Sequence, residues 1–243
     1  MAEPDHPAQP DGDDATEASS ALNRHRLQAM AAQARRLSFA LPASAVVTSA
    51  IVWPVAAPWQ LALWVAVIPL VRVLRARALL RLARHAGADV MPQTLTFSVL
   101  GGLVHSAPAW LWMAQLSVER KALLTMMLVS YATTAVSTNA HYLPGYIVYS
   151  TLLLAPLIVG WALHAWSVLA APLAPAFPFV ETMLPALLAA LLYVQYGFAR
   201  QAERTFVESF WIRYEKDRLL ADLRHERQAL AAERDRAEAA NRA

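Results

Sequence analysis

The stretch between Lys121 and Glu181 contains no Asp, Glu, Lys or Arg. This length holds two membrane spans of roughly 20 residues each, together with their turns. Pro144 and Gly145 interrupt the apolar pattern, so we place one span at about 122–138 and the next at about 145–166. The stretch therefore predicts a chain that crosses a membrane more than once.

Composition supports the same interpretation. Charged residues make up 16% of the chain and hydrophobic residues 57%, whereas soluble domains carry roughly 25% charged residues. The absence of cysteine excludes disulfides, thiolate metal sites and cysteine nucleophiles. The net charge of +3 is modest, and the basic residues stand beside apolar segments. Anionic lipid headgroups are therefore expected as partners, and nucleic acid is not.

Four further apolar segments lie at about 37–55, 59–74, 94–116 and 179–197. We therefore expect an all-α integral membrane protein with a six-helix transmembrane bundle over residues 37–197. The span at 122–138 is short and begins beside three charges, and without it five spans would remain. Gly101 and Gly102 would allow two helices to approach closely.

Five arginines lie at the end of the second segment or directly after it and form the densest positive cluster near any span: Arg72, Arg75, Arg77, Arg81 and Arg84. The positive-inside rule places this cluster in the cytoplasm, where we expect it to bind lipid headgroups. Six spans then put both termini in the cytoplasm and residues 171–178 outside. The expected location is a bacterial inner membrane.

The first 36 residues divide into two parts. Residues 1–20 are acidic, contain three prolines and have almost no large apolar side chain, so we expect a disordered tail. They also lack the pattern of a signal peptide. Residues 21–36 are basic and compatible with a helix, which we expect at the membrane surface.

Residues 198–243 contain neither Pro nor Gly and are rich in good helix formers. As one cytoplasmic helix this segment would be roughly 65 Å long. Leu223, Leu230 and Ala237 follow a heptad spacing with Leu220 beside them, which predicts a parallel coiled coil in a homodimer. Polar residues at the other core positions would keep that coil weak: Arg227, Arg234 and Asn241. A solvated single helix is the alternative.

The end of this segment carries a resemblance to a known family. Tyr214 to Ala243, above all Arg236-Ala-Glu-Ala-Ala-Asn-Arg-Ala243, resembles the helix upstream of the phosphoacceptor helix in bacterial hybrid sensor histidine kinases. The resemblance implies a phosphorelay, with a downstream kinase core that binds ATP and Mg²⁺ and a response regulator as partner. The phosphoacceptor box of that family does not occur in the chain, so no catalytic residue is carried over. His225 lacks the Leu-Arg-x-Pro that would follow such a histidine, and we interpret it as solvated.

Histidines and aromatic residues in the apolar region are the candidates for a ligand site. Ionisable groups are costly inside a membrane, which makes His105, His141 and His164 functional candidates. Aromatic walls with a few polar groups can bind an amphipathic small molecule or a signal that arrives through the lipid. The candidate set is His105, Trp110, Trp112, Tyr131, His141, Tyr146, Tyr149 and His164. Ordinary packing and an interfacial aromatic belt are the alternative. The histidines show no close ligand spacing, so no metal or cofactor site is predicted in this chain.

Three functions remain open. The first is the sensory input of a two-component histidine kinase, which would relay a signal through the coiled coil. The second is a membrane anchor that dimerises another signalling enzyme, such as a diguanylate cyclase. The third is a small transporter, which would show charges or broken helices near the membrane midplane. Because the apolar spans contain no carboxylate away from their ends, we favour the sensor.

Overall fold

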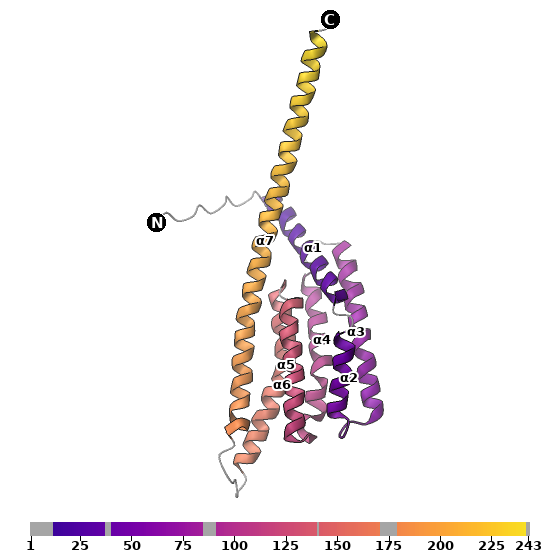
Figure 1. Cartoon of the computed structure of the whole chain (residues 1–243), viewed down its shortest axis with the longest axis vertical. Helices are drawn as coiled ribbons and strands as arrows, with labels where there is room; N and C mark the ends of the chain where they lie inside the picture. Colours follow the sequence, from indigo (N-terminus) through magenta and orange to yellow (C-terminus); the bar gives the residue numbers. More distant parts are fainter. Residues whose placement is uncertain (1–11, 37–39, 85–90, 140, 171–178, 242–243) are drawn as a thin grey trace, which may run out of the picture. The chain divides into compact units, whose positions relative to one another are not determined.

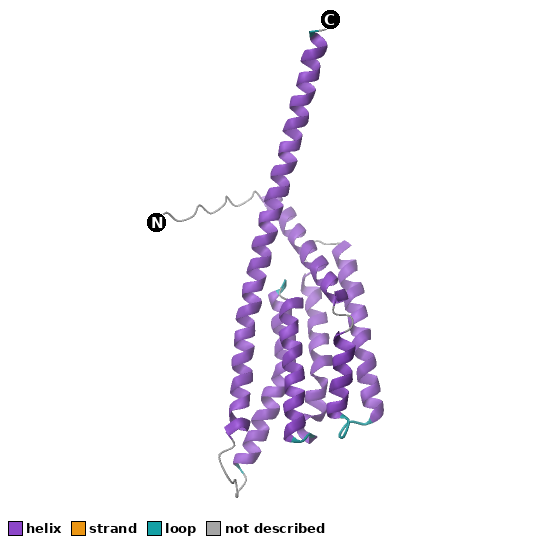
Figure 2. Cartoon of the chain, viewed as in Figure 1, coloured by secondary structure: helices purple, strands orange, loops and turns teal. Residues whose placement is uncertain are grey.

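The computed structural model describes residues 12–36, 40–84, 91–139, 141–170 and 179–241. These residues form helices joined by short turns, and no strand occurs among them (Figure 2). The helices are α1 (Gly12–Arg36), α2 (Ala40–Val52), α3 (Pro58–Arg84), α4 (Met91–Trp112), a short 3-10 helix η2 (Met113–Gln115), α5 (Val118–Asn139), α6 (Leu143–Leu169) and α7 (Phe179–Ala240). The predicted all-α class is confirmed.

The chain divides into two compact units, Met1–Glu203 and Arg204–Ala243. The first unit contains α1 to α6 and the apolar beginning of α7. The second is the rest of α7. We call residues 204–240 the rod. The long C-terminal helix expected from the sequence is therefore present, and α7 is a single helix from Phe179 to Ala240.

In the first unit, α4 and α6 form the most extensive helix pair, and α6 also packs against α5 (Figure 1). Helices α1 and α2 both pack along α3. Leu27 of α1 contacts the second half of α3 around Leu79, and Ala45 of α2 contacts the first half around Trp64. The central core is large and apolar, and its most deeply buried side chains are Trp161, Tyr146, Leu124, Leu128, Leu153, Leu154 and Leu157.

Gly102 explains how α4 and α6 come so close together. A Cβ atom at this position would lie 2.9 Å from Leu152 Cβ and 3.2 Å from the Tyr149 carbonyl oxygen. Real Cβ atoms do not approach other atoms so closely, so only glycine fits without a shift of α6. At Gly101 an added Cβ would make ordinary contacts of 3.5 Å with the Tyr149 ring. The close helix approach expected at this pair thus depends on Gly102.

The turns follow local chemistry that is visible in the sequence. Pro58 begins α3, a position where its missing N–H leaves no hydrogen bond unmade. The Gln60 side chain accepts a hydrogen bond from the Ala57 N–H at 3.1 Å, which caps the helix start. Helix α5 ends at Asn139 and α6 begins at Leu143, with Pro144 in its first turn. The predicted break between these helices is therefore correct.

A polar network ties the apolar part of α7 to α5 and α6. Gln195 is only 4% exposed, yet its side chain meets two partners. Its carbonyl accepts a hydrogen bond from the Tyr146 hydroxyl at 3.1 Å, and its amide donates to Thr133 at 3.0 Å. A buried amide that lacked such partners would be strongly destabilising. Gln195 therefore fixes the rotation of α7 beside these two helices.

The six-span prediction is only partly matched. Among the described helices, two are long and apolar enough to cross a membrane, α6 and the first part of α7. Helix α2 has 13 residues, too few for a hydrocarbon core that needs about 20. The apolar part of α3 is cut short by its arginines. Helices α4 and α5 have 22 residues each, but residues such as Gly101 and Thr133 lower their hydropathy.

The N-terminal prediction also needs correction. We expected residues 1–20 to be disordered, but residues 12–20 form the first turns of α1. Residues 1–11 lie outside the described part of the chain, as do residues 171–178, for which an extracytoplasmic loop was expected.

Candidate functional site

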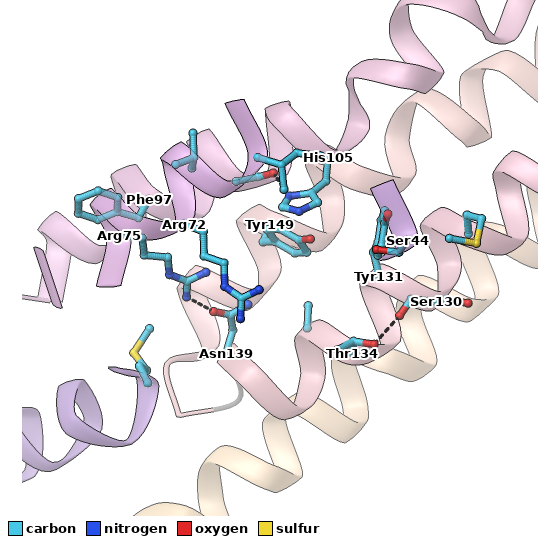
Figure 3. Close-up of a pocket in the computed structure, with 16 residues that line it drawn as sticks. Ser44, Arg72, Arg75, Phe97, His105, Ser130, Tyr131, Thr134, Asn139 and Tyr149 are labelled. Atoms are coloured by element: carbon cyan, nitrogen blue, oxygen red, sulfur yellow. Dashed lines mark hydrogen bonds between the residues drawn. The ribbon is translucent and has the colours of Figure 1, made fainter. Parts of the chain in front are cut away.

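The first unit contains a cavity of about 230 Å³. Its walls come from α1 to α6. The polar lining consists of Ser44, Arg72, Arg75, His105, Ser130, Tyr131, Thr134, Asn139 and Tyr149, and the rest is mostly apolar. Figure 3 shows these side chains converging from helices that are far apart in the sequence. A mainly apolar chamber with a few convergent polar groups is the usual form of a small-molecule site.

Two arginines enter the cavity from α3. Arg72 and Arg75 are three residues apart, so they lie on one face of the helix. Arg75 is half-buried, and its guanidinium donates a hydrogen bond to the Asn139 side-chain carbonyl (Figure 3). Among the described residues that line the cavity there is no Asp or Glu. The Arg75 guanidinium thus has a neutral amide as its hydrogen-bond partner.

His105 stands in the wall of the cavity between two tyrosine rings. Its ring centroid lies 5.4 Å from that of Tyr131 and 5.9 Å from that of Tyr149, both edge-on. His105 Nδ1 lies 2.7 Å from the Gly101 carbonyl oxygen, which can only accept, so Nδ1 carries the proton. His105 Nε2 is buried and has no hydrogen-bond partner in the described structure. An acceptor without a partner is thus held beside the cavity.

The hydroxyl groups of α5 are largely satisfied within their own helix. Ser130 donates to the Met126 carbonyl at 2.8 Å, and Thr134 donates to the Ser130 carbonyl at 2.8 Å. This bonding to the preceding turn is common for Ser and Thr in apolar helices. Tyr131 differs, since its hydroxyl lies 3.4 Å from the Thr48 hydroxyl of α2. The Tyr131 contact connects the short helix α2 to the cavity wall.

Three of the eight predicted ligand-site residues line the cavity together, namely His105, Tyr131 and Tyr149. The other five lie elsewhere. Trp112 is packed in the core, and Trp110 is 56% exposed. The Tyr146 hydroxyl donates a hydrogen bond to Gln195, whereas His164 contacts Lys121 and the Trp161 ring. His141 is half-buried outside the cavity.

The predicted arginine cluster is divided in the structure. Arg72 and Arg75 line the cavity, whereas Arg77 and Arg81 line a second, more open pocket with Gln93 and Phe97. Arg84 is exposed at the end of α3. The sequence analysis assigned all five to lipid headgroups and did not foresee that two of them line a cavity. Helical spacing could have separated them, because residues 72 and 75 lie on a different face of α3 from residue 77.

A polar joint lies at the end of the first unit. Arg26 Nη2 of α1 and the backbone N–H of Leu143 each donate to Glu203 Oε1 at 3.3 Å. Burial lowers the pKa of Arg26, and the Glu203 carboxylate acts in the opposite direction. The joint connects α1, the start of α6 and the last residue of α7 in this unit. The sequence analysis did not identify any of these three residues.

The predicted dimer seam lies on the rod. Leu220, Leu223 and Leu230 are 39%, 53% and 64% exposed, and Ala237 is exposed as well. Near the start of the rod, Phe210 and Tyr214 stack with ring centroids 5.8 Å apart. In the described part of the chain, no group of three or more His, Asp or Glu is placed to hold a metal ion.

No protein-family model, curated protein or solved structure matches this chain. The resemblance of its last helix to histidine kinases therefore remains a prediction.

Proposed function

We propose that this chain is the sensory input and signal-transmission module of a two-component histidine kinase. Residues 37–197 would detect a signal in a bacterial inner membrane, with six membrane-embedded segments and both termini in the cytoplasm. Residues 198–243 would relay it as a homodimeric coiled coil to a kinase core that binds ATP and Mg²⁺ and phosphorylates a response regulator. The observation that carries the proposal is the uninterrupted α7, which joins an apolar half to a polar half.

The distribution of polarity in the first unit supports a membrane location. Large apolar side chains are exposed along the bundle, among them Val46, Leu63, Leu70, Val99, Leu103, Leu111, Met126, Leu163 and Trp166. Polar side chains are buried inside it, among them Thr48, Ser98, Ser106, Thr125, Ser150 and Gln195. Soluble proteins rarely expose apolar surface on this scale. This argument supports membrane contact for α2 to α5, although each of them falls short of a membrane span in its length or in its hydropathy.

A continuous polar path supports coupling between the cavity and the end of the first unit. Arg75 bonds to the Asn139 side chain, and the Asn139 carbonyl accepts from the Tyr142 N–H at 2.9 Å. The next residue, Leu143, donates its N–H to Glu203. A change at Arg75 can therefore alter the position of the α5–α6 turn and the contacts of Glu203. No Gly or Pro follows Glu203 in α7, so rotation or tilt there passes along the helix.

The helical phase of the rod provides the test. Residues 1–243 are fused to the kinase core of a characterised histidine kinase and reconstituted in liposomes, and alanines are inserted after Tyr214. One inserted residue turns everything downstream by about 100°, whereas seven restore the phase to within about 20°. We expect autophosphorylation to change sharply with one residue and to return largely with seven.

A steady decline of activity with insert length, without periodicity, would contradict the sensor. The rod would then act as a passive tether, as expected for an anchor that only dimerises a downstream enzyme. Alanine is a suitable insert because it is the best helix former and adds no charge. The length series also serves as its own folding control, since every variant contains the same first unit.

A further inference from the structure

A lysine and a histidine meet at the end of the bundle where α5 begins and α6 ends. Lys121 Nζ of α5 lies 3.4 Å from His164 Nδ1 of α6. A charged ammonium has three N–H donors and no acceptor, so a hydrogen bond here requires that His164 Nδ1 carries no proton. Lys121 is only 7% exposed, and a charge that water reaches poorly depends on its protein partners. The contact therefore joins α5 to α6 only while His164 is neutral.

The neighbouring side chains hold these two groups close together. Trp161 is 1% exposed, and its ring lies edge-on to the His164 ring at a centroid distance of 5.7 Å. Trp161 Nε1 donates a hydrogen bond to the Thr125 hydroxyl at 2.8 Å, and this hydroxyl donates to the Lys121 carbonyl oxygen at 2.8 Å. The turn of α5 that carries Lys121 is thus bonded to the turn of α6 that carries His164.

The other charged groups near this contact differ in where they point. Arg120 Nη1 donates to two carbonyl oxygens at the end of α2, at 3.2 and 2.7 Å. Glu119 is exposed. Glu181, in the first turn of α7, acts electrostatically on His164. A protonated His164 would therefore be repelled by Lys121 on α5 and attracted by Glu181 on α7.

We propose that His164 is a proton-sensitive contact between α5 and α6, which is made while the ring is neutral and broken when the ring takes up a proton. The proton occupies Nδ1, removes the acceptor from Lys121 and places two positive charges side by side. In the proposed topology this end of the bundle is extracytoplasmic. The inference deepens the proposed function by naming external protons as the signal, and in that sense it rests on that function.

Gln195 provides a route from this contact to α7. Its side chain bonds at the same time to Thr133 of α5 and to Tyr146 of α6. A shift of α5 relative to α6 changes at least one of these two bonds, unless α7 moves as well. Because α7 continues into the rod as one helix, a change at His164 can reach the cytoplasmic segment.

Nitrogen NMR of labelled histidine tests the contact on the unmodified chain in phosphatidylcholine nanodiscs. Imidazole nitrogen shifts distinguish a protonated nitrogen from one that accepts a hydrogen bond. His164→Gln identifies the His164 signals among those of the seven histidines. We expect a hydrogen-bonded Nδ1 without a proton at about pH 8, and two protonated nitrogens at about pH 5. A protonated Nδ1 at the higher pH would overturn the proposal.

Two variants test the role of the lysine charge. Lys121→Met removes the charge and keeps an unbranched side chain. His164 should then take up its proton at a pH higher by at least about one unit, a tenfold change in proton affinity, because no like charge opposes it. Arg120→Gln is the matched control, since it removes a positive charge one residue away that is directed at α2. Equal shifts in both variants, or a shift in neither, would overturn the proposal. If Lys121→Met fails to fold, the measurement on the unmodified chain still decides.

Spin labels measure whether the two helices separate. Leu123→Cys on α5 and Leu163→Cys on α6 place labels at exposed positions of a chain that has no other cysteine. The distance between the labels should lengthen from about pH 8 to about pH 5. It should stay constant when His164→Gln is added, because glutamine can still accept from Lys121 but cannot take up a proton. Equal distances at both pH values without that change would overturn the proposal.

These measurements separate the contact from the proposed function, because they use no kinase. Loss of the phase dependence described above would remove the sensor function and leave the proton-sensitive contact in place. A retained phase dependence together with an unresponsive His164 would overturn the contact and leave a sensor of another signal.

Discussion

At the scale of single residues, His141 links stability to pH. This residue precedes α6, outside the apolar segments, and is half-buried. Burial lowers the pKa of His141, and the positive charges of His25 and Arg26 on α1 lower it further. The folded chain therefore takes up a proton at this site less readily than the unfolded chain, whose His pKa is about 6.5. Above that pH His141 is neutral in both states and does not reduce the free energy of unfolding. As the pH falls below it, the unfolded chain takes up the proton first, so the free energy of unfolding decreases.

A comparison of two proteins isolates this effect. We expect the unmodified chain to lose more thermal stability between about pH 7.5 and pH 5 than His141→Gln, because glutamine cannot take up the proton. Melting temperatures of both proteins in the same detergent provide the measurement. Parallel pH curves would mean that His141 titrates alike in the folded and unfolded chains.

Some residues of the site could be predicted from the sequence, and others could not. His105, Tyr131 and Tyr149 were chosen for their chemistry, and they line one cavity. Asn139 and Gln195 carried no signal as single letters, because an amide becomes informative only when burial and partners are known. Glu203 was also invisible, since its two donors come from α1 and from the start of α6, far away in the sequence.

At the scale of helices, the close packing of α4 against α6 can be tested by substituting Gly102. Gly102→Ala should destabilise the first unit by about 1–3 kcal/mol, the usual cost of overpacking, because the new Cβ would lie 2.9 Å from Leu152 Cβ. Gly197→Ala is the matched control in α7, where an added Cβ meets nothing within 4 Å. This second change should stabilise by up to about 1 kcal/mol through helix propensity.

Chemical denaturation in mixed micelles measures both variants. The midpoints should move in opposite directions, to lower denaturant for the change at residue 102 and slightly higher for the change at 197. A similar shift for both would mean that α4 and α6 can separate at little cost. Their close approach would then not be a constraint on the bundle.

Helix positions were more predictable than their relation to a membrane. The break at Asn139 to Leu143 and the long α7 followed from Pro, Gly and the periodic pattern. Membrane spans were harder to identify, because α3 to α5 mix apolar residues with Arg, Ser, Thr and Gly, and both kinds of residue occur on buried and on exposed faces. The composition of a helix does not distinguish its buried face from its exposed face. Only the exposure of individual side chains separates the two.

At the scale of the whole molecule, the proposed homodimer can be tested by crosslinking along the rod. The chain has no cysteine, so single cysteines give crosslinks without background. Cysteines at Leu223, Leu230 and Ala237 should form disulfides across a parallel dimer more readily than those at Ala221 or Gln228, because only the first three lie on the heptad seam. Crosslinking yield in native membranes is the measurement, and equal yields at all five positions would remove the seam.

The long stretch without Lys or Arg also determines how a protease can divide the chain. Trypsin cuts after Lys and Arg, and the chain offers no such residue between Lys121 and Arg200. The rod, by contrast, carries many arginines on a helix that is exposed almost throughout, where local unfolding costs little. A tryptic digest would thus shorten the rod to small peptides and leave α5, α6 and the start of α7 in a single large fragment. Peptide mapping of the cavity consequently calls for a protease that cleaves at aromatic residues.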